Sequence, residues 1–408
     1  MKNRSSILNI RSFFPALDQT INGKKLIYLD NGATSQKPIS VIELVNEMNS
    51  GINGNIHRAV HELSAKTTAL YEGARDKVMN FVNASCREEI IFTGGTTASI
   101  NLVAFSFSRD ILKPGHSILI SGGEHHSNIV PWQMACERSG ATLRVLPLDD
   151  NGCWRMDLLD KLLDSSVKIV SVAHISNILG VINPIEEVIK KAHSLNIPVL
   201  IDGAQGIVHS KVDVQKLGCD FYAFSGHKMY GPTGIGVLYG KYNLLEKISP
   251  FMGGGDMIES VNFAKTTYAP PPLKFEAGTP NFIGAAALGA AVDFISEIDV
   301  EQASINEKEI TQYMLKELKA IESITLYGNS PNKIPLFSFT VKGAHPTDLA
   351  LLMDNMGVAL RSGQMCSEPV MDRFCVESML RASFAVYNTI EEAQQFIESL
   401  KKAIKMLA

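Results

Sequence analysis

The apolar residues of the central part of the chain fall alternately into short runs and into helical spacing. Residues 168–176 (KIVSVAHIS) and 197–202 (IPVLID) are short runs rich in β-branched residues, which is typical of buried strands. Between them, residues 184–196 begin with proline and carry apolar residues on one helical face, namely Ile185, Val188, Ile189, Ala192 and Leu195. Strands that alternate with helices of this length predict a mainly parallel sheet covered by helices on both faces.

The pattern continues on both sides of this region and then changes. Residues 89–112 predict a strand, a glycine turn and a helix whose apolar face comprises Ile100, Val103, Ala104, Phe107 and Ile111. Residues 221–228 and 234–240 predict further strands, whereas beyond residue 293 charged amphipathic helices flank the strand LFSFTVKG. We expect an α/β protein with a large domain at 25–292. A smaller α+β domain is expected from 1–24 and 293–408.

Composition limits the classes of function. Apolar residues make up 45% of the chain and the formal net charge is −4, so no nucleic acid and no membrane is expected as a partner. No apolar run reaches about 18 residues, and the N-terminus lacks the features of a signal peptide. Six scattered cysteines without a C-x-x-C pair argue against a disulfide framework or a metal site. A cytoplasmic protein is therefore expected.

A carboxylate and a lysine each follow a predicted strand. Asp202 closes IPVLID, and Lys228 lies between an apolar strand and a glycine-rich turn. Taken singly, Asp202 could be a helix cap or a buried hydrogen-bond partner, and Lys228 could be a solvated lysine. Taken together, they match a pyridine-ring cofactor, which needs a carboxylate for its ring nitrogen and an amine that forms an imine. The carboxyl ends of neighbouring parallel strands would bring the two together.

Two further segments suit the same cofactor. GGTTAS (94–99) places Thr96 and Thr97 at the head of a helix, where a phosphate binds well, and Ser225 and His227 add donors beside the lysine. The adjacent histidines of GGEHHSNIVPW could be metal ligands, but no second cluster with suitable spacing exists. We favour an imidazole stacked on the cofactor ring, and of the pair we favour His125.

Eight segments resemble one enzyme family, in order, from about residue 9 to residue 405: YLDNGATSQKP, NIHRAVHELS, EHHSNIVPWQ, HISNILGVINPI, IDGAQ, FSGHKMYGPTGIGVLYG, KFEAGTPN and RSGQMCSEP. They are similar to the cysteine desulfurase/selenocysteine lyase family. This family lies within the class V aminotransferase group of fold-type-I enzymes that depend on pyridoxal 5'-phosphate. More narrowly, they resemble its Suf-type (group II) branch. The resemblance implies a mostly parallel seven-stranded sheet between helices in the large domain.

The resemblance also implies roles in holding the cofactor. Lys228 would form the Schiff base, Asp202 would pair with the pyridinium nitrogen, Gln205 would contact the ring oxygen and His125 would stack on the ring. Phosphate contacts are implied for Thr97, Ser225 and His227, with Thr279 reaching the phosphate from the partner subunit of a homodimer with shared active sites.

The remaining implied roles concern the substrate and the sulfur. Arg381 would bind the substrate carboxylate, as an arginine fork can, with help from Asn177. Arg361 and His57 are also expected near the substrate. Cys366 would be the nucleophile, because a reactive thiolate needs an accessible loop near cations, and residues 361–370 suit such a loop.

The implied reaction converts L-cysteine to L-alanine and leaves a persulfide on Cys366, from which an acceptor protein takes the sulfur for iron–sulfur clusters or other thio-products. A lyase acting on L-selenocysteine or cysteine sulfinate would share the cofactor residues. An aminotransferase and a non-catalytic scaffold are more distant alternatives. Two segments depart from the family pattern: Gly94 and Ala98 stand where arginine and glutamate are common, and Gln364-Met365 lacks the common histidine. These departures bear on the sulfur-transfer step and on the acceptor.

Overall fold

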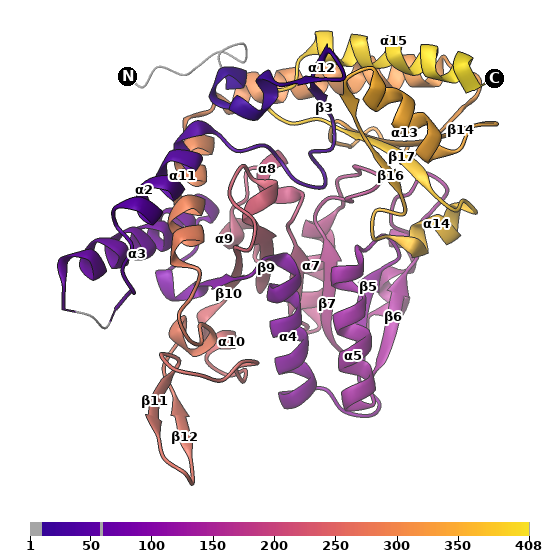
Figure 1. Ribbon diagram of the computed structural model, residues 1–408. Helices are drawn as coiled ribbons and strands as arrows, with labels where there is room; N and C mark the ends of the chain where they lie inside the picture. Colours follow the sequence, from indigo (N-terminus) through magenta and orange to yellow (C-terminus); the bar gives the residue numbers. More distant parts are fainter. Residues whose placement is uncertain (1–9, 58–59, 408) are drawn as a thin grey trace.

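The structure is a computed structural model that describes residues 10–57 and 60–407. Figure 1 shows a large sheet with helices against it, and a second, smaller layer of strands and helices above it that contains the end of the chain. Segments from both ends of the sequence meet in this upper layer, because the early strand β3 (Ile27–Tyr28) pairs with the late strand β15 (Val358–Ala359).

The large sheet has seven strands. Their spatial order is β4 (Ile90–Thr93), β10 (Gly236–Gly240), β9 (Phe221–Ser225), β8 (Val199–Asp202), β7 (Val167–Ala173), β5 (Ser117–Ser121) and β6 (Thr142–Leu146). Strand β10 runs antiparallel to both of its neighbours, and the other adjacent pairs are parallel. The predicted mostly parallel, seven-stranded α/β sheet is confirmed.

Helices cover both faces of this sheet because successive strand residues point to opposite sides. On one face, α4 (Thr96–Asp110) and α5 (Val130–Ser139) pack on residues such as Ile91 and Ile118. On the other, α3 (Glu62–Val82), α7 (Ile185–Ser194) and α11 (Phe282–Glu297) pack on residues such as Ile90 and Val170. Helix α2 (Ile39–Ser50) packs against α11.

The predicted apolar faces of two helices are correct except at their last positions. Ile100, Val103, Ala104 and Phe107 are buried in α4, and the first four predicted residues of α7 are buried as well. Ile111 and Leu195 were expected to share these faces, but they are 38% and 46% exposed. The reason is that each lies just beyond the end of its helix, where helical periodicity no longer directs side chains to the core.

The smaller sheet is antiparallel and has the order β13 (Ile324–Tyr327), β14 (Leu336–Val341), β17 (Met379–Ser383) and β16 (Arg361–Gly363). Helices α12 (Val300–Lys319), α13 (Pro346–Asn355) and α15 (Ile390–Leu407) share its core. The predicted boundary at residue 292 falls within α11, and Ile27 and Leu29 belong to the core of the smaller sheet. The division into two domains stays a prediction.

Shorter elements fill the connections. Among the described residues, four helices have a single turn: α6 (Leu159–Leu162), α8 (Gly206–His209), α9 (Val214–Leu217) and α10 (Tyr242–Leu245). The short strands β1 (Thr20–Ile21) and β2 (Lys24–Lys25) pair with each other. A hairpin of β11 (Ile258–Val261) and β12 (Thr266–Tyr268) projects from the body of the molecule (Figure 1). Among the described helices, none is both long and apolar enough to cross a bilayer.

Candidate active site

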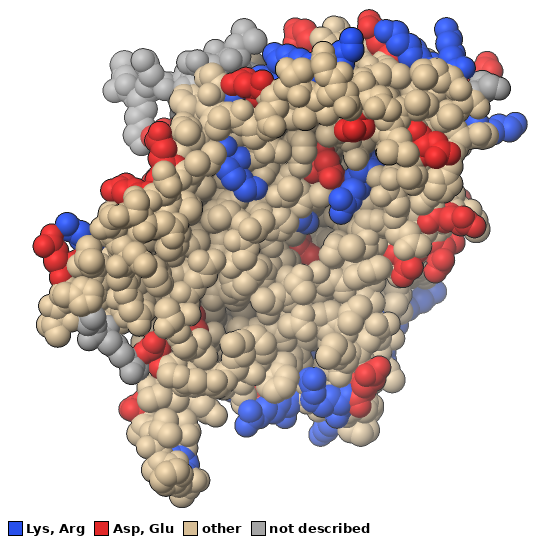
Figure 2. All heavy atoms as spheres, viewed as in Figure 1, with Lys and Arg blue, Asp and Glu red and all other residues tan. Residues whose placement is uncertain are grey.

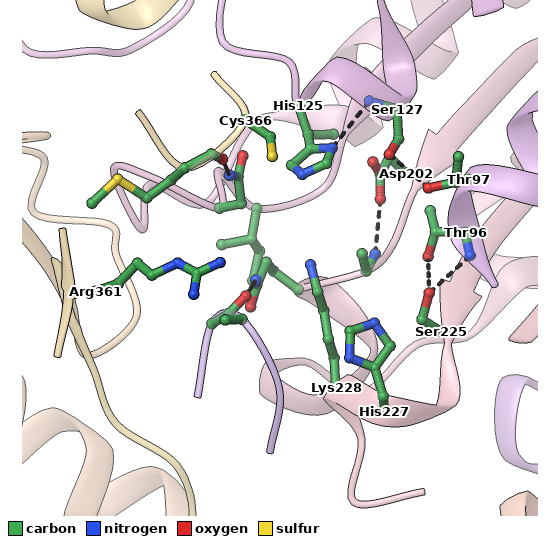
Figure 3. A pocket seen from close by; sticks show the side chains of 18 of the residues that line it. Thr96, Thr97, His125, Ser127, Asp202, Ser225, His227, Lys228, Arg361 and Cys366 are labelled. Atoms are coloured by element: carbon green, nitrogen blue, oxygen red, sulfur yellow. Dashed lines mark hydrogen bonds between the residues drawn. The ribbon is translucent and has the colours of Figure 1, made fainter. Parts of the chain in front are cut away.

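A cavity of about 240 Å³ lies between the large sheet and the smaller sheet. Figure 2 shows a hollow in this part of the surface, with both basic and acidic atoms visible inside it. Twelve of the residues singled out in the sequence line the cavity: Thr96, Thr97, His125, Asn177, Asp202, Gln205, Ser225, His227, Lys228, Arg361, Cys366 and Arg381. Figure 3 shows most of them converging on one space. Two others, His57 and Thr279, do not line it.

Asp202 and Gln205 lie at the carboxyl end of β8. The Asp202 carboxylate is buried and accepts a hydrogen bond of 2.9 Å from the Ala204 N–H. Burial raises the pKa of Asp202, while the Ala204 N–H and the nearby Lys228 amine lower it. A buried carboxylate is costly without a cationic partner, so this site suits a protonated ring nitrogen. Gln205 is held beside it by a 2.8 Å bond from Nε2 to the Gly32 carbonyl.

Lys228 lies in the single 3-10 turn Gly226–Lys228 that follows β9. The turn is fixed from outside, because the His227 carbonyl accepts bonds from the Ser35 N–H at 3.0 Å and the Thr34 hydroxyl at 3.1 Å. Burial lowers the pKa of the Lys228 amine, and Asp202 opposes that shift. A lowered pKa favours the neutral amine, which is the nucleophilic form.

Hydroxyl groups gather at the first turn of α4. The Thr96 N–H donates to Ser225 Oγ at 2.8 Å, and the Thr97 and Ser127 hydroxyls lie 2.7 Å apart. Gly95 has a φ of +136°, and a Cβ there would come within 3.1 Å of Ser225 Oγ. The first turn of α4 contains no acidic residue. A helix N-terminus surrounded by hydroxyl groups suits an anion such as a phosphate.

His125 precedes a short 3-10 turn, His126–Asn128, and its ring faces the cavity (Figure 3). Burial, followed by the charges of Lys228 and other nearby cations, lowers the pKa of His125 to about 3. Burial also lowers the pKa of His227 to about 4. Both rings are therefore neutral near pH 7. A neutral, flat His125 ring at the wall of the cavity suits stacking on an aromatic ring.

The two arginines lie opposite each other on β16 and β17, where Arg361 and Arg381 form a cross-strand pair. Asp30 lies between them, with one carboxylate oxygen 3.1 Å from Arg381 Nη2 and the other 3.7 Å from Arg361 Nη1. Arg381 also donates to the Asn177 carbonyl at 2.8 Å. Its Nε is buried and finds no partner among the described residues. Arg381 lines the cavity, and each Nη carries a second N–H that can donate to a carboxylate there.

Cys366 carries an exposed thiol on the loop between β16 and α14 (Glu368–Phe374). Asn177 binds this loop on both sides of the cysteine: its Nδ2 lies 3.0 Å from the Met365 carbonyl and 3.3 Å from Ser367 Oγ. Figure 3 shows the thiol on the same side of the cavity as His125. The arrangement brings a thiol, the half-buried Lys228 amine and the buried Arg381 to one space.

The sequence matches the family model for class-V aminotransferases over residues 27–396. It is 47% identical to a probable cysteine desulfurase of Halalkalibacterium halodurans, over 96% of this chain and 97% of the relative. The chain belongs to the cysteine desulfurase family, within the class-V aminotransferases. This family assignment agrees with the resemblance found in the sequence.

Solved structures of cysteine desulfurases have the same fold. CsdA of Escherichia coli is 39% identical and superposes with a TM-score of 0.92, and the comparison covers 100% of both chains. The apo cysteine desulfurase of Thermococcus onnurineus NA1 is 36% identical, with a TM-score of 0.94 and the same coverage. The fold-type-I architecture expected from the resemblance is therefore confirmed.

Three polar residues in the cavity lining or next to it were missed in the sequence. Asp30 lies in the segment YLDN, but its two arginine partners are more than 300 positions away in the chain. Ser127 lines the cavity, and its hydroxyl lies 2.7 Å from that of Thr97. Glu124 is buried and accepts bonds from the Ala173 N–H and the Asn128 amide. The segment containing Ser127 and Glu124 was recognised, but its pattern does not tell which polar residues face inward.

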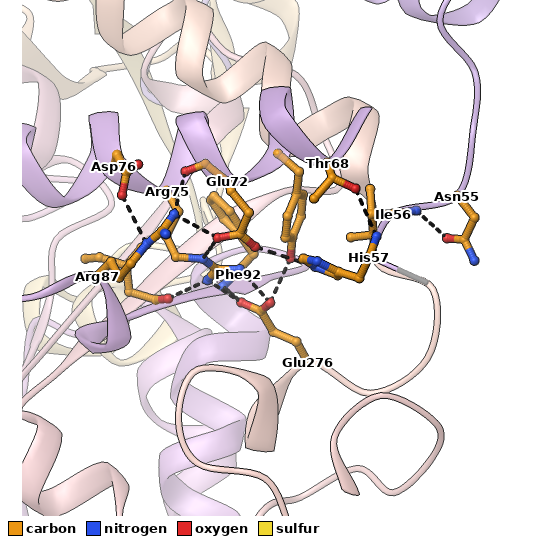
Figure 4. Close-up of polar contacts among 12 residues, drawn as sticks. Asn55, Ile56, His57, Thr68, Glu72, Arg75, Asp76, Arg87, Phe92 and Glu276 are labelled. Carbon is orange, nitrogen blue, oxygen red and sulfur yellow. Dashed lines mark hydrogen bonds and ion pairs between the residues drawn. The ribbon is translucent and has the colours of Figure 1, made fainter. Parts of the chain in front are cut away.

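His57 and Thr279 lie away from the cavity of this single chain. His57 Nε2 is 3.5 Å from Glu72, which also binds Arg75 and Arg87 (Figure 4). Thr279 is exposed, three residues after the buried Glu276. The expectation that Thr279 reaches the phosphate of a partner subunit stays a prediction, and so does the substrate role of His57.

Proposed function

We propose that this protein is a cysteine desulfurase that uses pyridoxal 5'-phosphate to convert L-cysteine to L-alanine and keeps the sulfur on Cys366. One observation carries the proposal. An exposed cysteine lines the same cavity as the half-buried Lys228 and the buried Arg381. The finer assignment to the Suf-type branch is part of this proposal.

The residues of the cavity fit the cofactor. Asp202 would pair with its ring nitrogen, Gln205 with its ring oxygen and Lys228 with its aldehyde carbon, while His125 would lie on the ring. The phosphate would lie at the first turn of α4, with donors from Thr96, Thr97, Ser225 and His227. When bound, the cofactor supplies an electron sink next to the substrate α-carbon.

The protein's own groups would then act in sequence. Arg381 would bind the substrate carboxylate, and Asn177 and Arg361 would help to position it. The neutral Lys228 amine would take the α-proton. The Cys366 thiolate attacks the substrate sulfur, so a sulfur–sulfur bond forms as the carbon–sulfur bond breaks. The electron pair of the broken bond returns to the substrate carbon, which is protonated to give alanine. The sulfur is oxidised as the carbon is reduced, so no outside oxidant is needed.

The proposal also covers the oligomeric state, the sulfur acceptor and the location in the cell. We propose a homodimer in which Thr279 and His57 serve the partner's cavity, because both lie away from the cavity of their own chain. An acceptor protein would take the sulfur from the exposed loop of Cys366 for iron–sulfur clusters or other thio-products. We also propose a cytoplasmic location, which suits an enzyme with six free cysteines.

The test is product analysis with three proteins. The wild type should release alanine and, with a reductant, sulfide from L-cysteine. Lys228→Ala should lose the visible absorbance of the bound cofactor. Cys366→Ser should keep that absorbance and lose sulfide release, because a hydroxyl cannot carry a persulfide. If Cys366→Ser retained turnover of L-selenocysteine or cysteine sulfinate while the wild type ignored L-cysteine, the lyase alternative would replace this proposal.

A further inference from the structure

The two adjacent histidines of the segment 124–128 serve different parts of the molecule. The His125 ring lines the cavity, whereas His126 is absent from the lining, and the two ring centroids are 6.3 Å apart. His126 lies instead against the loop that carries Cys366. The function described so far makes use of only one member of the pair.

His126 contacts the thiol loop at two points. Its backbone N–H donates a 2.8 Å hydrogen bond to the Cys366 carbonyl. Its ring Nε2 accepts a 3.2 Å bond from the Glu368 N–H. The two hydrogen bonds therefore connect His126 to Cys366 and to Glu368. Because a backbone N–H can only donate, Nε2 is the acceptor of this bond; the Glu368 carboxylate lies 3.9 Å from the same nitrogen.

The loop needs such support because of its backbone conformation. Met365 and Cys366 have φ angles of +50° and +56°, so two consecutive non-glycine residues are left-handed. This conformation is unfavourable for side chains with a Cβ and persists where surrounding contacts hold it. Asn177 holds the loop from the cavity side, and His126 holds it from the outer side.

We propose that His126 is a positioning residue that directs the Cys366 thiol toward the substrate sulfur. The inference rests on the proposed function for its effect on turnover. The His126 ring does not line the cavity, and its hydrogen bond goes to the loop: with the Glu368 N–H bound, the Cys366 turn keeps its thiol over the cavity. Without the ring, the turn samples conformations in which the thiol faces away.

Three variants separate this role from a general structural one. His126→Ala removes the acceptor, whereas His126→Gln replaces it with an amide oxygen at the end of a side chain of similar reach. His345→Ala is a matched control beside the same loop: His345 lines a surface pocket together with Gln364 and Glu368, but its ring accepts the Thr347 N–H, at the same distance of 3.2 Å at the start of α13.

The kinetic measurement determines kcat and KM separately for alanine release from L-cysteine. His126→Ala should lower kcat about threefold to tenfold, the equivalent of one neutral hydrogen bond. Its KM and cofactor absorbance should stay at the wild-type values, because Arg381, Lys228 and Asp202 are untouched. His126→Gln should recover most of the lost kcat, and His345→Ala should keep the wild-type kcat.

A second readout does not depend on turnover. Trypsin would place Cys366 in the peptide 362–373 and Cys375 in the peptide 374–381, so an exposed thiol on a neighbouring peptide serves as an internal reference. In the holoenzyme, the ratio of Cys366 to Cys375 alkylation should rise in His126→Ala, and the Glu368 amide should exchange hydrogen faster. Neither should change in His345→Ala.

The outcomes are distinguishable. If His126→Ala kept the wild-type kcat and alkylation ratio, or if it raised KM with kcat unchanged, the positioning role would be wrong. If His345→Ala matched its effects, the loss would be a general loss of stability. If the wild type itself released no alanine, the proposed function would fail, while the alkylation ratio would still decide whether His126 holds the loop.

Discussion

The charges around Arg381 are balanced by a residue from the other end of the sequence. Arg361 and Arg381 occupy directly opposite positions on neighbouring strands, which is unfavourable for two like charges. Asp30 contacts both guanidinium groups and offsets that repulsion. Asp30 engages Nη2 and the Asn177 carbonyl engages Nη1, and each of these nitrogens carries a second N–H that can donate to a ligand.

Arg381→Lys tests this arrangement. Lysine keeps the positive charge but loses the planar set of donors, so the substrate carboxylate would lose a charge-assisted hydrogen bond of about 1.5–3 kcal/mol. We expect KM for L-cysteine to rise at least about tenfold, with the cofactor absorbance unchanged. Arg361→Lys should have a smaller effect, since the Arg361 side chain is 53% exposed. Equal effects of the two variants would contradict the role of Arg381.

Single residues could be predicted where the local sequence limits their position. Asp202 and Lys228 each follow an apolar strand, and the parallel order of β8 and β9 then brings them to one edge. Asp30 could not be found in this way. Its hydrogen bond to Arg381 spans 351 positions, and no local pattern indicates a contact between such distant segments.

One buried ion pair connects elements that the sequence keeps apart. Arg75 on α3 binds Glu276 with two 2.8 Å bonds, and both side chains are nearly inaccessible to solvent (Figure 4). Glu276 also accepts bonds from the Tyr71 hydroxyl and the Phe92 N–H, both at 2.7 Å. These bonds fix the segment that leads to Thr279 against α3 and β4.

Removing one partner of this pair should strongly destabilise the protein. Arg75→Met leaves the Glu276 carboxylate buried without its cation, so the free energy of unfolding should fall by about 3–5 kcal/mol. The same helix offers a control, because Lys77 pairs with Asp293 in an exposed position. Lys77→Met should cost about 1 kcal/mol or less. Denaturant unfolding of the two variants measures the difference, and equal losses would refute the special role of the buried pair.

The limits of element prediction are physical. Helices α4 and α7 were predicted because a continuous apolar stripe faces the sheet, and the errors fell at Ile111 and Leu195, where the helix had already ended. The hairpin β11–β12 was not predicted. Its residues are mostly exposed, so neither strand has a buried face. The sequence therefore lacks the alternation of apolar and polar residues that indicates a strand.

Two features of the whole molecule bear on the proposed homodimer. The β11–β12 hairpin projects into solvent and carries the exposed apolar side chains of Val261 and Phe263 (Figure 1). Thr279 is exposed and lies outside its own cavity. These features support a homodimer with shared sites, but no sequence pattern places the two-fold axis.

Mixed dimers test the sharing of sites. Thr279→Asp would repel the phosphate in the partner's cavity, and Lys228→Ala disables a chain's own cavity. A dimer with one chain of each kind has one cavity with both defects and one intact cavity. Equal amounts of the two inactive variants, unfolded and refolded together, should therefore regain about one quarter of the wild-type activity. No recovery in refolded mixtures that contain dimers would show that Thr279 serves its own chain.

The central claim is that sulfur from L-cysteine moves onto Cys366. Mass spectrometry of the tryptic peptide 362–373, after one turnover with L-cysteine and rapid alkylation, measures this directly. We predict one additional sulfur atom on Cys366, together with one alanine released per modified chain and no addition to the peptide that contains Cys375. Alanine formed while the Cys366 peptide remains unmodified, or an equal modification of Cys375, would contradict the account.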